Sequence, residues 1–112
     1  MTTALAVKRK WTSAEYLSLE RASAEKHEYI NGEIFAMAGC SLKHDRVATS
    51  LLAAFSNRLR GSRCEPHSSD VRIHIPATGK YTYSDGFIIC GPEFTDDSLD
   101  TVTNPCVIAE VL

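Results

Sequence analysis

Two acidic residues, Glu110 and Asp85, stand in apolar surroundings where an ionised side chain needs a specific partner. The other residues of the segment 107–112 are all apolar, and Asp85 lies at the entrance of the apolar run 87–89. Ionised carboxylates are almost never fully buried unless they are paired or bound to a metal. If the two segments are adjacent strands, the carboxylates converge at one end of a sheet and can bind Mg²⁺ or Mn²⁺ through oxygen. Such a metal activates water and stabilises charge on a phosphorus under attack.

A simpler interpretation of the same two acids stays open. Each carboxylate can sit at a strand end, either solvated or in an ion pair with a nearby arginine such as Arg72. Perturbed carboxylates also occur in purely structural ion-pair networks. The pattern alone therefore leaves both a metal site and a structural role for Asp85 and Glu110.

The cysteines and histidines offer a weaker metal pattern. The four cysteines contain no C-x-x-C pair, so free thiols are expected. The pairs Cys40 with His44 and Cys64 with His67 have spacings compatible with zinc. Both pairs flank a well-formed helical pattern that already accounts for their surroundings, and zinc is not expected.

The composition is that of one ordinary globular domain in the cytoplasm. The chain has 112 residues, of which 44% are hydrophobic and 23% charged, with a formal net charge of −2. No apolar run is long enough to span a membrane, and residues 1–10 carry their basic cluster after a short apolar stretch, which is the wrong order for a secretory signal. These first ten residues are expected to be flexible. A net charge of −2 is not typical of a nucleic-acid-binding protein, which usually shows a basic patch. It does not exclude one, because a site that holds divalent cations must itself be acidic.

The first half of the chain predicts a helix, a hairpin and a second helix. Thr12 and Glu15 form a T-x-x-E capping box, so a surface helix is expected from about 12 to 22–24. Asn31-Gly32 is the dipeptide that favours a two-residue turn, which makes 27–38 a β-hairpin. Ser41 can cap a core helix whose apolar residues recur at helical spacing until Gly61.

The second half predicts three strands. The first, 71–76, alternates apolar and polar residues, and the second, 81–90, passes from alternation into an apolar run. A polar loop at 93–104 precedes a buried strand within 106–112. Since a buried strand is usually followed by an element that covers it, the chain is expected to end before its fold is complete.

Five segments carry a family resemblance, and they agree with the family pattern in order as well as in type. They are Glu28–Ile34, Ser41 with His44, Ser69–Ile73, Tyr83-Ser84-Asp85 and Ile108–Leu112. Across residues 11–112 the sequence resembles the Uma (Uma-two) family of predicted restriction endonucleases, within the PD-(D/E)XK nuclease superfamily.

The resemblance implies a restriction-endonuclease-like α/β (α+β) fold, a mixed sheet flanked by helices, and phosphodiester hydrolysis assisted by Mg²⁺ or Mn²⁺. It matches Asp85 to the Asp of the PD element and Glu110 to the acid of the (D/E)XK element, so both would be metal ligands. Glu28 would be a third acidic member of the site, although a solvated glutamate beside Lys26 is an equal alternative. The implied partner is DNA, and superfamily members often pair as homodimers.

Three further residues are candidates for supporting the acids or contacting DNA. His44 matches a family histidine, but a histidine at the rim of an apolar helix face is more often structural. Asp70 matches a commonly acidic position and could equally be a turn residue that hydrogen-bonds its own backbone. Arg72 lies two residues later, within the strand expected at 71–76.

Several positions depart from the family pattern. Ser84 replaces the proline before the Asp, and Gly86 stands where an apolar strand former is preferred. Leu112 occupies the position of the superfamily's lysine, and the helix in which the family commonly places its lysine is absent from this chain. The pattern therefore predicts a domain that lacks its C-terminal helix and last strand.

Two functions follow from these residues. The first is a Mg-dependent endonuclease with Asp85 and Glu110 as metal ligands. The second is a non-catalytic remnant, or a DNA-binding or oligomerising module that keeps the fold without turnover. The retained acids favour the first function, and the missing lysine favours the second.

Overall fold

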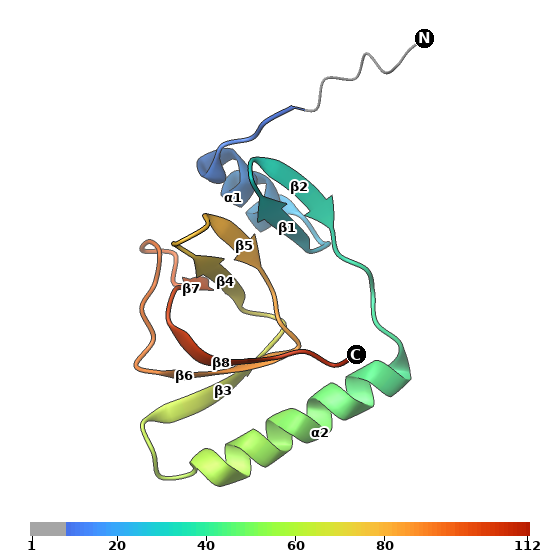
Figure 1. Cartoon of the computed structure of the whole chain (residues 1–112), viewed down its shortest axis with the longest axis vertical. Coiled ribbons are helices and arrows are strands. Elements are labelled where there is room, and N and C mark those ends of the chain that lie inside the picture. The colour runs from blue at the N-terminus through green and yellow to red at the C-terminus, as the bar shows by residue number, and fades with distance from the viewer. Residues whose placement is uncertain (1–8) are drawn as a thin grey trace.

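The computed structural model describes residues 9–112 (Figure 1). Residues 1–8, most of the segment expected to be flexible, lie outside that range. The described part contains two helices and eight strands. The helices are α1 (Ser13–Ala22) and α2 (Leu42–Leu59). The strands are β1 (His27–Ile30), β2 (Glu33–Ala36), β3 (Cys64–Ser68), β4 (Arg72–Ile75), β5 (Lys80–Thr82), β6 (Gly86–Cys90), β7 (Thr101–Val102) and β8 (Pro105–Ala109).

The strands form two sheets. A five-stranded sheet has the order β2-β1-β5-β4-β7, and its β4 and β7 run parallel while its other pairs are antiparallel. An antiparallel three-stranded sheet has the order β3-β6-β8. The expected mixed α/β class is confirmed, but the expectation of one sheet is wrong. The predicted strand 81–90 divides at residues 83–85, so that β5 joins the first sheet and β6 the second.

The predicted ends of α1 and of the hairpin are confirmed. Thr12 and Glu15 form the reciprocal capping box, which satisfies two backbone N–H groups at the start of α1. Asn31 and Gly32 take positive φ values of 50° and 80° in the turn between β1 and β2. However, α1 is not a mere surface helix, because it fully buries Tyr16 against β1 and β5.

Helix α2 is capped as predicted but does not form the core. The Ser41 side chain accepts the His44 backbone N–H, and Gly61 follows the helix with a left-handed φ of 83°. None of the described helix residues is fully buried. The reason is that α2 packs mainly against β3 and β6, and much of its surface meets solvent (Figure 1).

The main core joins the two sheets. Ile73 of β4 and Val102 of β7 pack against Phe87 and Ile89 of β6, and all four side chains are buried. The predicted apolar run at 87–89 therefore does enter the interior. By contrast β8 is not the buried strand that its sequence predicts, since Val107 and Ile108 remain 44% and 48% exposed.

The cysteines differ from expectation. Cys64 and Cys90 are cross-strand partners on β3 and β6 and form a disulfide, whereas Cys40 and Cys106 are free thiols. Free thiols were predicted because the sequence contains no C-x-x-C pair, and the pairing of β3 with β6 that brings Cys64 to Cys90 was not foreseen. The disulfide also removes Cys64 from any zinc pair with His67. Among the described residues, no helix has both the length and the apolar character needed to cross a bilayer.

Candidate functional site

Strand pairing brings Asp85 and Glu110 together. Gly86 of β6 pairs with Ala109 of β8, so the residues just beyond this pair, Asp85 and Glu110, lie opposite each other where the two strands end. The Val111 backbone N–H donates a hydrogen bond to Asp85 Oδ2 at 2.7 Å. This contact fixes the carboxylate of Asp85 relative to the end of β8.

His44 reaches the same carboxylate from another element. The first turn of α2 lies beside the C-terminal end of the chain (Figure 1), and His44 Nε2 is 3.3 Å from Asp85 Oδ2. In the part of the chain that the structure describes, His44 Nδ1 is buried without a hydrogen-bond partner. If Nε2 carries the proton toward Asp85, Nδ1 keeps a lone pair, because the hydrogen bond at one ring nitrogen selects the tautomer. Helix capping at Ser41 is thus what delivers a histidine to the acid pair.

The acid pair concentrates negative charge. Although Glu110 is largely exposed, partial loss of hydration around its carboxyl and the negative charge of Asp85 raise its pKa above the ordinary value of 4.5. The charge of Glu28 adds to the same shift. A divalent cation would relieve this repulsion, so the electrostatics of the pair suit a cation ligand.

Glu28 lies near the pair but has partners of its own. On β1 it accepts a 2.6 Å hydrogen bond from Thr82 Oγ1, and Lys80 Nζ lies 3.8 Å from the same oxygen. Its carboxylate therefore belongs to the five-stranded sheet. Glu28 is thus tied to the five-stranded sheet and is an electrostatic neighbour of Glu110, and its part in the site stays a prediction.

Asp70 and Arg72 are not brought to the acid pair. Asp70 is largely exposed and its carboxylate meets Lys26 Nζ at 3.2 Å. Arg72 is buried, donates to Tyr83 Oη and Thr101 Oγ1, and lies 3.3 Å from Asp100. Its guanidinium is committed to Tyr83, to β7 and to the loop before β7.

A cavity of about 560 Å³ opens beside the acids. Its walls come from the segment before β1, the segment between β2 and α2, the start of α2 and the ends of β6 and β8. Among the described residues that line it, Lys26 is the only lysine or arginine. Sequence reasoning missed Lys26, because nothing in its spacing separates it from other surface lysines. The residues of the cavity that carry polar or reactive groups include Lys26, Cys40, His44, Ser69, Tyr83, Asp85 and Glu110.

The donor set fits magnesium better than a closed metal cage. No cluster of three or more His, Cys, Asp or Glu side chains suited to a metal occurs within residues 9–112. Mg²⁺ does not need such a cluster, since it keeps several waters and is usually bound through one or two carboxylates and the substrate's phosphate. Two adjacent carboxylates at the edge of an open cavity meet that requirement.

Comparison with known proteins places the chain in a family. Residues 13–112 match the Uma2 family model, described as "Putative restriction endonuclease". The chain belongs to the Uma2 family. The predicted resemblance is therefore confirmed over almost its whole expected range.

Two relatives come from Synechocystis sp. (strain ATCC 27184 / PCC 6803 / Kazusa). The uncharacterized protein slr1290 is 40% identical over 103 residues, which are 92% of this chain and 54% of that protein. The uncharacterized protein sll1609 is 41% identical over 102 residues, which are 90% of this chain and 58% of that protein. The chain thus spans little more than half the length of these Uma2 relatives.

A solved structure shares the fold. The crystal structure of "a putative nuclease belonging to DUF820" from Anabaena variabilis ATCC 29413 superposes with a TM-score of 0.61 at 16% identity. The match covers 80% of this chain and 48% of that one. At this identity the likeness establishes that the Uma2 chain shares the fold of that protein.

Proposed function

We propose that this chain is a Mg²⁺- or Mn²⁺-dependent endonuclease domain that hydrolyses DNA phosphodiester bonds, with Asp85 and Glu110 as the metal ligands. The observation that carries the proposal is the convergence of these two carboxylates across β6 and β8 at the edge of a cavity. Membership of the Uma2 family supports a nuclease activity. Because the chain covers about half of its relatives, the activity of the whole protein is part of the proposal.

Each side chain of the site has a distinct task in this mechanism. The metal, when bound, would activate the attacking water and stabilise charge on the phosphate. Asp85 is held in place by the Val111 N–H and by His44, so it presents a fixed oxygen toward the cavity. Lys26 offers a cation to a substrate phosphate within the same cavity. Glu28 reinforces the negative charge from the five-stranded sheet.

Cleavage of plasmid DNA tests the proposal. We expect the chain to nick or linearise supercoiled plasmid with Mg²⁺ or Mn²⁺ and not with EDTA. Asp85→Asn should lower the rate by roughly 100-fold or more, because the loss of one ligand weakens both metal binding and charge stabilisation. Asp97→Asn is the matched control, since Asp97 is an exposed acid outside the cavity. Gel densitometry over time measures the rates.

Two outcomes would count against this function. Equal cleavage by the wild-type chain and Asp85→Asn would point to a contaminating nuclease. DNA binding without cleavage would instead support the alternative of a non-catalytic module, which the leucine at position 112 favours.

Metal-dependent stabilisation gives an independent test. Ionisation of Glu110 costs stability above its ordinary pKa of 4.5, because its folded-state pKa is raised. Without metal at pH 7.5, Glu110→Gln should therefore melt at a temperature equal to or above that of the wild-type chain. Adding Mn²⁺ should raise the wild-type melting temperature by mass action and leave the Gln variant nearly unchanged. Differential scanning fluorimetry measures both, and an equal metal shift in the two proteins would remove Glu110 from the ligand set.

We also infer a homodimer in the cytoplasm, where the DNA substrate is found. Strand β8 lies at the edge of its sheet and exposes Val107 and Ile108, and a second copy of the chain could extend that sheet by edge pairing. Sedimentation equilibrium measures the assembly, and a monomer at all accessible concentrations would contradict it.

A further inference from the structure

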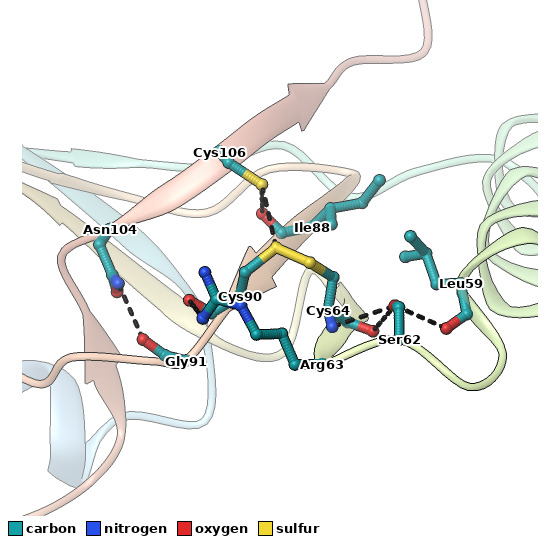
Figure 2. Close-up of a disulfide and its surroundings, with 9 residues drawn as sticks. All are labelled: Leu59, Ser62, Arg63, Cys64, Ile88, Cys90, Gly91, Asn104 and Cys106. Atoms are coloured by element: carbon teal, nitrogen blue, oxygen red, sulfur yellow. Dashed lines mark hydrogen bonds between the residues drawn. A yellow bond between two sulfur atoms is a disulfide. The ribbon is translucent and has the colours of Figure 1, made fainter.

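Three cysteines gather on three neighbouring strands at the end of the small sheet opposite the acid pair. Cys64 of β3 and Cys90 of β6 are joined as a disulfide. Cys106 of β8 is a free thiol whose Sγ lies 3.8 Å from Cys90 Sγ, on the other side of β6 from Cys64 (Figure 2). A free thiol therefore stands in van der Waals contact with a disulfide sulfur.

An irregularity in β8 places Cys106 there. Ile88 pairs with Val107 while Ile89 pairs with Pro105, so Cys106 is the extra residue of a β-bulge. Bulges re-aim side chains, and here the Cys106 thiol donates to the Ile88 carbonyl at 3.3 Å while it faces Cys90. The side chain is exposed, so it can change rotamer rapidly and line up with the bond that it attacks.

We propose that Cys64, Cys90 and Cys106 form a thiol–disulfide exchange site. The Cys106 thiolate attacks Cys90 Sγ, a Cys90–Cys106 bond forms, and the Cys64–Cys90 bond breaks. Cys64 leaves as a thiolate and takes up the proton that Cys106 released. One disulfide replaces another, so the step consumes no oxidant or reductant.

The local charge favours this exchange. Arg63 precedes Cys64, and its Nη1 donates to the Cys90 carbonyl at 3.4 Å. When Cys64 departs as a thiolate, its negative charge appears one residue from Arg63, and a neighbouring guanidinium favours such a charge.

The exchange changes which strands are tied together. The disulfide shown in Figure 2 links β3 to β6, whereas its product would link β6 to β8. Asp85 directly precedes β6, and Glu110 directly follows β8. The exchange would thus tie β6 to β8 at the end of these strands that lies opposite the two acids. The proposal does not depend on whether the chain cleaves DNA.

Tryptic mapping can follow the exchange directly. The sequence has Lys or Arg at 63, 72 and 80 and none after Lys80, so trypsin yields peptide 64–72 and peptide 81–112. The present disulfide joins these two peptides. The exchanged disulfide lies within 81–112 and frees 64–72 with an alkylatable thiol. Full-length oxidised protein is incubated without oxygen at mildly alkaline pH and quenched with excess N-ethylmaleimide under denaturing conditions at near-neutral pH. Because every free thiol is then blocked, it can be digested with trypsin without further exchange and analysed by mass spectrometry.

The expected result is alkylated 64–72 that accumulates with time in the wild-type chain. It should exceed the amount in Cys106→Ser by roughly tenfold or more, because a neighbouring thiol acts at high effective concentration. Cys40→Ser should match the wild-type chain, since Cys40 is the other free thiol and is not part of the cluster. In Cys64→Ser, mild oxidation with oxidised glutathione should close a Cys90–Cys106 disulfide within 81–112.

The proposal fails if 64–72 stays linked to 81–112 in the wild-type chain to the same extent as in Cys106→Ser. It also fails if release requires Cys40, because exchange would then run between molecules. Absence of a Cys90–Cys106 disulfide in oxidised Cys64→Ser would likewise overturn it.

Discussion

Asp100 shows how one half-buried carboxylate holds two arginines from different elements. Arg21 of α1 contacts both of its oxygens, at 2.9 and 3.0 Å, and Arg72 of β4 lies 3.3 Å away. The hydrogen bonds from Arg21 are the largest cause that holds the pKa of Asp100 far below its ordinary value of 3.8. Asp100 therefore ties the loop before β7 to the first helix.

This depressed pKa predicts how stability responds to acid. A carboxyl whose pKa is lowered by folding contributes stability above its ordinary pKa of 3.8 and loses it as pH falls further. Asp100→Asn should cost about 1 kcal/mol at pH 7, a modest figure because the side chain is 36% exposed and solvent screens it. As the pH falls below 3.8, towards the much lower folded-state pKa of Asp100, this cost should shrink. Urea denaturation at pH 7 and pH 3 measures the difference, and an equal cost at both values would exclude the ion pairs as its origin.

Asp85 and Glu110 are the residues of the candidate site that the sequence alone could single out. Glu110 and Asp85 stand out because their neighbours are apolar, and the family pattern marks both. Lys26 could not be found this way, since its place in the cavity depends on where the segment before β1 passes the end of β6. His44 was predicted as a supporting residue, and its contact with Asp85 needed the orientation of α2.

Gly86 sets how closely α2 approaches β6. A Cβ built at this residue would lie 3.1 Å from Leu52 Cδ2 and 3.7 Å from the His67 carbonyl oxygen. In the sequence, Gly86 departs from the family's preference for an apolar strand former at this position. The structure gives that departure a packing reason, because the missing side chain makes room for the helix that carries His44.

A larger side chain at this position should push the helix away. Gly86→Val is expected to destabilise the chain by about 1–3 kcal/mol, as overpacking does in close-packed interiors. Gly39→Val is the matched control, since nothing lies within 4 Å of a Cβ at Gly39, and its effect should stay within about 0.5 kcal/mol. Urea denaturation followed by circular dichroism compares them. A Gly86→Val variant as stable as the wild-type chain would show that α2 can shift away from β6 without loss of stability.

The elements were predicted where local chemistry decides them and missed where distant residues do. Three local features depend on only a few neighbouring residues, and all three were confirmed: the helix caps at Thr12 and Ser41 and the turn at Asn31-Gly32. Strand β3 was missed because Pro66 interrupts its pattern, which an edge strand tolerates. The break after β5 was missed because the apolar alternation continues through Tyr83, although the chain leaves one sheet there and enters another.

The two sheets share one hydrophobic core, so their stabilities are linked. Ile73 and Val102 of the larger sheet contact Phe87 and Ile89 of the smaller one, and all four are buried. A shared core couples the stability of the elements that build it, which supports the expectation of one domain.

One cooperative transition should therefore unfold both sheets. Thermal melts recorded by far-ultraviolet circular dichroism and by Trp11 fluorescence should give midpoints within about 2 °C of each other, because coincident probes mark a two-state transition. Trp11 adjoins the larger sheet, where its backbone N–H donates to the Gly32 carbonyl, while α2 and its strong helical signal belong with the smaller sheet. Separate midpoints would divide the chain into two folding units.

The open edge of β8 also bears on how readily this protein aggregates in solution. Val107 and Ile108 face solvent beside backbone groups that no further strand covers in the described chain. Uncharged β-branched edges of this kind recruit other strands without regard to register, and they drive aggregation when concentration rises. We therefore expect the strand that carries Glu110 to the acid site also to limit the solubility of the chain.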